Sequence, residues 1–180
     1  MRAVLSKTPG GPETLVVRDV LDPTPKTGEV IIEVKAVGIN YPDTLIIEDK
    51  YQFRPERPFS PGAEVAGVVE AVGEGVKGVR KGDRVIAVPG WGGLVERLAV
   101  RAETVIPIPD AMSFEEAAAL IMTYGTSYYA LKDRAQLKAG ETLLVLGAAG
   151  GVGAAAVELG KAMGAKVVAA ASTNDKVEFA

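Results

Sequence analysis

The sequence contains no cysteine and no histidine. These two absences exclude disulfides, thiolate nucleophiles and imidazole bases, and they remove the usual protein ligands of zinc. Carboxylates, lysine, tyrosine, hydroxyls and amides remain available for chemistry. Any redox activity therefore requires a bound cofactor.

Long apolar runs and basic runs are also missing. No stretch is long and apolar enough to cross a bilayer, and the N-terminal MRAVLSKTPGG lacks the features of a signal peptide, so we expect a cytoplasmic location. The formal net charge is −3, and the lysines and arginines are scattered along the chain. This distribution disfavours a nucleic acid or an anionic membrane as a partner.

Short predicted strands fill the first two thirds of the chain. Residues 30–39 (VIIEVKAVGI) alternate in a way that predicts a strand with one well-buried face. The other candidate strands are residues 1–7, 15–20, 64–72, 83–88, 94–100 and 104–106. The linkers between them are rich in glycine and proline. Closely spaced strands with such turns predict a small antiparallel barrel.

A helical pattern begins at Ser113. Ser113 and Glu116 have the spacing of a capping box, in which each side chain accepts a hydrogen bond from the other residue's backbone. Alanine-rich sequence then runs through Met122, and a second helical stretch extends to about Lys132, with Gly125 as an interruption between them. We expect the junction between two structural units here.

The last segment predicts one βαβ unit. Residues 142–147 (TLLVLG) are a continuous apolar run, as expected for a strand buried on both faces. Residues 151–163 predict a helix that ends at a left-handed Gly164 and has Val152, Ala156, Leu159 and Met163 on one apolar face. Residues 166–171 predict the second strand. Because a dinucleotide fold needs two such halves, we expect the sequence to be part of a longer protein.

A glycine-rich turn, Gly147–Gly153 (GAAGGVG), separates the first strand from the helix. Aligned on its end, it is the dinucleotide fingerprint with alanine in the first position. Small residues there allow a tight turn, close approach of a pyrophosphate and close helix–strand packing. Such a pattern alone often marks a plain helix-capping turn, but the strand before it and the helix after it favour a cofactor site. We predict that its contacts come from Ala148, Gly150, Gly151, Val152 and Gly153.

The end of the second predicted strand distinguishes between cofactors. An NAD site usually has an acidic residue here for the ribose hydroxyls. Ser172 and Thr173 instead leave room for a 2′-phosphate, which Lys176 can neutralise. We therefore predict NADP(H), with Ser172 and Lys176 in its site. The alternative is that Asp175 plays the acidic role and Lys176 is a solvated helix residue.

Five motifs occur in order along the chain: GINYPD at 38–43, PGAEVAGVV at 61–69, KGDRV at 81–85, TYGTSYYAL at 123–131 and the turn at 148–153. Together they resemble the medium-chain dehydrogenase/reductase superfamily, in its zinc-free quinone oxidoreductase branch. The resemblance implies a GroES-like β-barrel-type catalytic domain, mainly β with short helices, over residues 1–123. The start of a Rossmann α/β domain, the N-terminal half of an NADP-binding domain, then covers residues 124–180.

Zinc-dependent members of the superfamily have cysteine and histidine where this sequence has Asn40, and Pro61 and Gly62 ahead of Glu64. Soft ligands are absent throughout, so the zinc-free branch is the consistent choice and no metal is expected. Glu64 itself is interpreted as structural.

The resemblance also implies which residues line the reaction pocket. Asn40, Asp43 and Tyr51 are the candidate catalytic residues. The Asn40 amide would donate to a cofactor or substrate oxygen, Tyr51 would donate to the acceptor or help deliver a proton, and Asp43 would orient either. Thr126 is implied to contact the cofactor. The alternatives are that Asp43 is an acid at a helix N-terminus and that Thr126 merely starts a helix.

The implied activity is NADPH-dependent, metal-independent hydride transfer to a quinone or related conjugated carbonyl. Two alternatives remain: a medium-chain enoyl or enone reductase, which differs in the acceptor, and a non-catalytic NADPH-binding protein. The resemblance further implies that the full-length form is a homodimer. Three aromatic residues could flank a flat substrate, although packing is the commoner role for such residues: Tyr41, Phe53 and Trp91.

Overall fold

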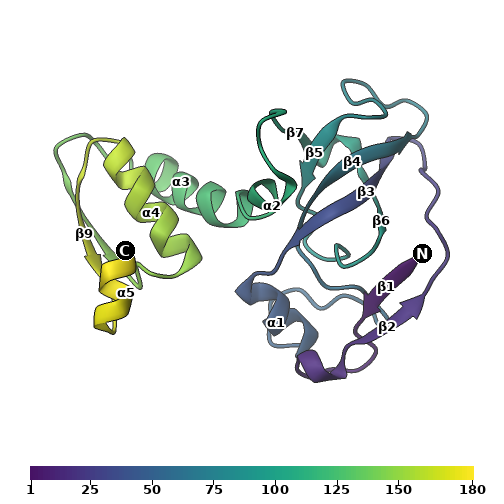
Figure 1. Ribbon diagram of the computed structural model, residues 1–180, viewed down its shortest axis with the longest axis horizontal. Helices are drawn as coiled ribbons and strands as arrows, with labels where there is room; N and C mark the ends of the chain where they lie inside the picture. Colours follow the sequence, from purple (N-terminus) through teal and green to yellow (C-terminus); the bar gives the residue numbers. More distant parts are fainter. The chain divides into compact units, whose positions relative to one another are not determined.

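The computed structural model describes all residues from Met1 to Ala180. The chain divides into two compact units, Met1–Ala119 and Leu120–Ala180, and each is described by itself (Figure 1). The division lies four residues before the predicted boundary at residue 123. None of the helices has the length and apolar character that a membrane span requires.

The first unit is built on a curved antiparallel sheet of five strands in the order β6-β3-β4-β5-β7 (Figure 1). Their bounds are β3 Glu29–Gly38, β4 Glu64–Val72, β5 Arg84–Ala87, β6 Arg97–Arg101 and β7 Val105–Pro107. A two-stranded sheet of β1 (Arg2–Leu5) and β2 (Val16–Asp19) is joined to the rest through a bridge between Ala3 and Val95. The expected mainly β fold of this unit is confirmed.

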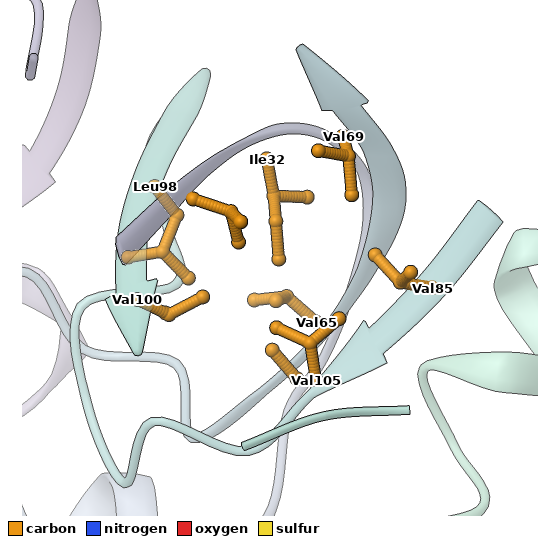
Figure 2. Close-up of a cluster of buried hydrophobic side chains, with 9 residues drawn as sticks. Ile32, Val65, Val69, Val85, Leu98, Val100 and Val105 are labelled. Carbon is orange, nitrogen blue, oxygen red and sulfur yellow. The ribbon is translucent and has the colours of Figure 1, made fainter. Parts of the chain in front are cut away.

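The core of this unit lies inside the curve of the sheet, where valines from all five strands meet Ile32, Ala87 and Leu98 (Figure 2). Val30 and Ile32 point into it, as the alternation predicts. Ile31 is also buried, however, because the opposite face of β3 is covered as well, and a register shift between Ile31 and Ile32 adjusts the pairing with β4. More of β3 is thus enclosed than the alternation predicts.

Short helices complete the first unit: η1 Pro12–Thr14, α1 Tyr41–Ile47, η2 Ala102–Thr104 and α2 Phe114–Ala117. The predicted capping box opens α2. The Ser113 hydroxyl oxygen accepts from the Glu116 backbone at 3.1 Å, and the Glu116 carboxylate accepts from the Ser113 backbone at 2.9 Å. The helix packs on β3 and β4, and a Cβ on Gly38 would lie only 2.0 Å from the Ala118 carbonyl oxygen. Only glycine allows this close approach.

The second unit begins with one continuous helical run, formed by η3 Ile121–Gly125, α3 Thr126–Tyr128 and η4 Tyr129–Arg134. The two flanking segments are π-helical turns. The predicted interruption at Gly125 is wrong. Its φ of −60° and ψ of −44° are ordinary helical angles, and the widened π turns accommodate it without a break.

The βαβ unit follows, with β8 Thr142–Leu146, α4 Gly151–Ala162 and β9 Lys166–Ala170, and a short α5 Asn174–Phe179 comes last. The strands β8 and β9 are parallel, as predicted. Gly164 has a φ of +82° just after α4, which confirms the left-handed residue at the helix end.

Burial in this unit is one-sided on the strands and differs on α4 from the predicted apolar face. In β8 only Leu143 and Val145 face α4, whereas Leu144 and Leu146 are 58% and 76% exposed, because a single helix covers one face of the two strands. On α4 the buried residues are Ala155, Val157 and Gly160, and Val152 is 48% exposed. The helix is turned this way because it approaches β8 at Gly160, where a Cβ would lie 2.6 Å from the Leu143 side chain.

Candidate functional site

The glycine-rich turn connects the end of β8 to the start of α4. Gly147 adopts the left-handed conformation with a φ of +68°, and the Gly150 backbone N–H donates to the Gly147 carbonyl at 3.0 Å. Ala148 is fully buried in the small core of this unit, and its N–H donates to the Ala170 carbonyl. The tight turn of the fingerprint is thus made at Gly147, one residue before the alanine that the alignment put in the first position.

Gly153 is the position where helix and strand come closest. A Cβ there would lie 2.3 Å from the Gly147 carbonyl oxygen and 2.9 Å from the Ala148 Cα, and neither backbone atom can move aside cheaply. At Gly150 a Cβ would meet only the same carbonyl oxygen, at 3.4 Å. The two glycines therefore serve different purposes: Gly153 allows packing, and Gly150 keeps the outer surface of the turn open.

The first turn of α4 presents unpaired backbone donors. The N–H of Ala154 is the first that bonds within the helix, to the Gly150 carbonyl at 2.7 Å. The N–H groups of Gly151, Val152 and Gly153 have no acceptor within the chain. Three such groups at the positive end of a helix dipole are suited to bind an anion such as a pyrophosphate.

A hollow of about 570 Å³ lies beside this turn, at the carboxyl ends of the two parallel strands. Open α/β sheets bind ligands at this edge. The hollow brings together three of the predicted cofactor residues, Gly150, Ser172 and Lys176, and its remaining lining is Leu146, Gly147, Ala149, Ala170 and Ala171. Asp175 does not line it, which favours the interpretation of Lys176 as a ligand of the cofactor.

Thr126 and Thr173 have local roles in their helices. Thr126 is an exposed residue at the start of α3, continuous with the preceding π turn. The Thr173 hydroxyl oxygen caps α5 and accepts from the Lys176 backbone at 3.4 Å. The proposed contact between Thr126 and the cofactor stays a prediction.

In the first unit, Asn40 and Asp43 form a linked pair at the start of α1. The Asn40 backbone N–H donates to one oxygen of Asp43 at 2.8 Å, and the Gly62 backbone N–H donates to the other at 3.1 Å. Asp43 is only 4% exposed. With both oxygens occupied by backbone donors, its geometry favours the interpretation of Asp43 as a structural acid at a helix N-terminus.

The side-chain amide of Asn40 is held more loosely. Its nitrogen lies 3.5 Å from the Gly38 carbonyl oxygen and 3.5 Å from a carboxylate oxygen of Glu64. Glu64 is fully buried, in agreement with its interpretation as structural. Hydrogen bonds this long are weak, so the amide can turn towards a bound molecule.

Tyr51 is anchored by packing. It lies against the buried cluster of Ile46, Ile47 and Phe59, and its ring centroid is 5.7 Å from that of Phe53. The predicted hydrogen bond from its hydroxyl to a substrate stays a prediction. Tyr51 shares the first unit with Asn40 and Asp43, whereas the predicted cofactor residues beyond Asn40 belong to the second unit.

Arg57 holds the loop that carries Tyr51, and the sequence did not predict this role. The guanidinium donates to the Asp49 carboxylate and to the Ile47 carbonyl, each at 2.8 Å, and to the Ser6 hydroxyl at 3.2 Å. The segment YQFRPERPFSP contains two arginines, and nothing in the sequence separates the partly buried Arg57 from the exposed Arg54.

The structure also contains no group of three acidic, histidine or cysteine residues placed to hold a metal ion.

Comparison with known proteins agrees with this architecture. Residues 26–110 match the alcohol dehydrogenase GroES-like domain family. The human quinone oxidoreductase is 42% identical over 177 residues, which cover 97% of this chain and 54% of that protein. The chain thus spans about half the length of the curated relatives it matches.

The chain is also similar to solved structures of two reductases, each of which is longer than this chain. The quinone oxidoreductase of Thermus thermophilus, determined alone and in complex with NADPH, is 44% identical with a TM-score of 0.87, over 98% of this chain and 55% of that one. The CurK enoyl reductase is 35% identical with a TM-score of 0.90, over 99% and 56% of the two chains.

A GroES-like unit followed by the start of a Rossmann-type unit with a glycine-rich turn defines a medium-chain dehydrogenase/reductase. Within that superfamily, this chain is similar to quinone oxidoreductases over about half of their length.

Proposed function

We propose that this protein is an NADPH-dependent, metal-independent oxidoreductase that transfers a hydride to a quinone or a related conjugated carbonyl. The observation that carries the proposal is the set of three unpaired N–H groups at the start of α4, next to a hollow that contains Ser172 and Lys176. The quinone oxidoreductase relatives support it.

The residues of the second unit fit this cofactor. The N–H groups of Gly151–Gly153 would receive the pyrophosphate, because they lie at the positive end of α4. Ser172 has a small side chain beside the hollow, and the Lys176 ammonium provides the positive charge that a 2′-phosphate requires. When bound, NADPH supplies the hydride.

The residues of the first unit would bind and orient the acceptor. The Asn40 amide would donate a hydrogen bond to an oxygen of the cofactor or acceptor, and the Tyr51 hydroxyl would donate to the acceptor oxygen, on which negative charge develops. Exposed aromatic rings in this unit suit a flat acceptor: Tyr41, Phe53 and Trp91.

The test of the cofactor assignment is a titration of the full chain with NADPH and with NADH. We expect NADPH to bind more tightly, and we expect Lys176→Ala to remove most of this preference while leaving NADH affinity unchanged. Lys161→Ala is the matched control, since Lys161 is an exposed lysine in the last turn of α4. Equal affinities of the unaltered chain for the two cofactors would refute the assignment.

The second candidate function is an enoyl or enone reductase, which the similarity to the CurK enoyl reductase supports. A panel of quinones, α,β-unsaturated ketones and thioesters, followed by NADPH absorbance, separates the two. If NADPH binds and none of these acceptors is reduced, the protein is an NADPH-binding protein without this activity.

A cytoplasmic location and a homodimeric full-length form are further proposals, which rest on the sequence and the family resemblance.

A further inference from the structure

A single buried hydroxyl reaches the first turn of α4 from the neighbouring helical run. Ser127, in α3, is 2% exposed, and its Oγ donates a hydrogen bond of 2.8 Å to the carbonyl oxygen of Val152, the second residue of α4. Buried hydroxyls are almost always hydrogen-bonded. The acceptor of this one lies in the turn that carries the unpaired N–H groups.

The geometry of the peptide group gives this bond a consequence for anion binding. The carbonyl of Val152 and the N–H of Gly153 belong to one planar trans peptide, in which the oxygen and the hydrogen point in opposite directions. A donor that fixes the Val152 oxygen therefore fixes the direction of the Gly153 N–H. That N–H is one of the three donors without an acceptor.

Two other residues of the same helical run contact α4. The Thr123 methyl group lies against Gly151, where a Cβ would come within 3.0 Å of it. The Tyr124 hydroxyl donates to the Glu158 carboxylate at 2.6 Å, about two helical turns further along α4. The Tyr124 bond holds the body of the helix, and the Ser127 bond holds its first turn.

We propose that Ser127 is a positioning residue for the cofactor, which orients the first turn of α4 so that its N–H groups point at the pyrophosphate. The inference rests on the proposed function, because it assumes that NADPH binds at this turn. The first turn lacks part of the hydrogen bonding that holds the helix interior, so an outside donor restricts its motion before the ligand arrives.

The test compares two ligands on the full chain. NADPH contains the pyrophosphate, whereas 2′-AMP contains the adenosine and the 2′-phosphate without it. We expect Ser127→Ala to weaken NADPH binding by about threefold to tenfold, the range for one hydrogen bond, and to leave 2′-AMP binding unchanged. Ser127→Cys fills the same space with a weak donor and should resemble Ser127→Ala. Tyr124→Phe should leave the affinity for both ligands unchanged.

The outcomes separate this inference from the proposed function. If the unaltered chain does not bind NADPH, the proposed function fails and the inference falls with it. If the unaltered chain binds and both Ser127 variants bind NADPH equally well, only the positioning role is refuted. An equal loss of NADPH and 2′-AMP affinity in both variants would also refute it, because such a loss indicates general loosening of the unit.

Discussion

Asp43 and Gly62 are joined by a hydrogen bond of 3.1 Å from the Gly62 backbone N–H to the Asp43 carboxylate, across nineteen residues of sequence. The same carboxylate accepts from the backbone of Asn40 at 2.8 Å. Asp43 thus connects the start of α1 to the segment that leads into β4. Asp43 thereby holds Asn40 in place, and Asn40 is the residue proposed to contact the reacting molecules.

Removal of this carboxylate is expected to destabilise the protein. Asp43→Ala leaves the buried Gly62 N–H without an acceptor, which should lower the free energy of unfolding by roughly 1–3 kcal/mol, measured by urea denaturation. Glu48→Gln is the control, because its ion pair with the exposed Lys50 lies at the surface and should contribute little. A variant with unchanged stability and abolished turnover would instead indicate that Asp43 takes part in the chemistry.

Two glycines of the turn should respond differently to an added methyl group. Gly153→Ala places a Cβ 2.3 Å from a backbone oxygen, so we expect it to lower the unfolding free energy by about 1–3 kcal/mol and to impair NADPH binding. At Gly150→Ala the backbone is extended and the new Cβ would meet only one oxygen, at 3.4 Å, so this variant should weaken NADPH binding with little change in Tm. The two effects are measured by thermal unfolding and by fluorescence titration. Tight NADPH binding by Gly150→Ala would place the phosphates elsewhere.

Arg57 should control the loop that carries Tyr51. Arg57→Ala removes three hydrogen bonds, one of which is also an ion pair to Asp49, so we expect a lower Tm and a raised KM for the acceptor, with the Kd for NADPH unchanged. Arg57→Lys should restore only part of this, since an ammonium cannot reproduce the planar set of donors. The exposed Arg54 of the same loop provides the control. If Arg54→Ala raises the KM as much as Arg57→Ala does, the effect is one of charge and not of loop structure.

The hydrogen bond between Tyr124 and Glu158 predicts a pH dependence. It raises the pKa of Tyr124 above the ordinary value of 10.0, so the folded state favours the protonated phenol. Its stabilisation is fully present below pH 10.0 and is lost as the pH rises through the higher pKa of the folded state.

Denaturant unfolding at a series of pH values measures this effect. The stability difference between the unaltered protein and Tyr124→Phe should be constant near neutrality and should shrink above pH 10.0. Tyr129→Phe, at an exposed tyrosine of the same helical run, should show no such trend. A difference that persists at high pH would mean that the bond does not set the pKa of Tyr124.

Much of the fold could be predicted because its signals are local. The alternation in residues 30–39, the Ser113–Glu116 capping box and the strand–turn–helix pattern around Gly147–Gly153 each depend on neighbours in the sequence. All three appear in the structure. Burial was predicted less well, because the exposed sides of Leu144 and Val152 depend on which segments pack against them.

The sequence by itself determined the fold class, the glycine-rich turn between strand and helix and the absence of cysteine and histidine, since each follows from residue types and their spacing. The tertiary structure decided which residues hold these features in place. Only the folded chain puts the Ser127 hydroxyl on the Val152 carbonyl and the Gly62 N–H on Asp43. Such bonds join segments that are distant in the sequence, and their strength depends on distances of a few tenths of an ångström, which no local pattern encodes.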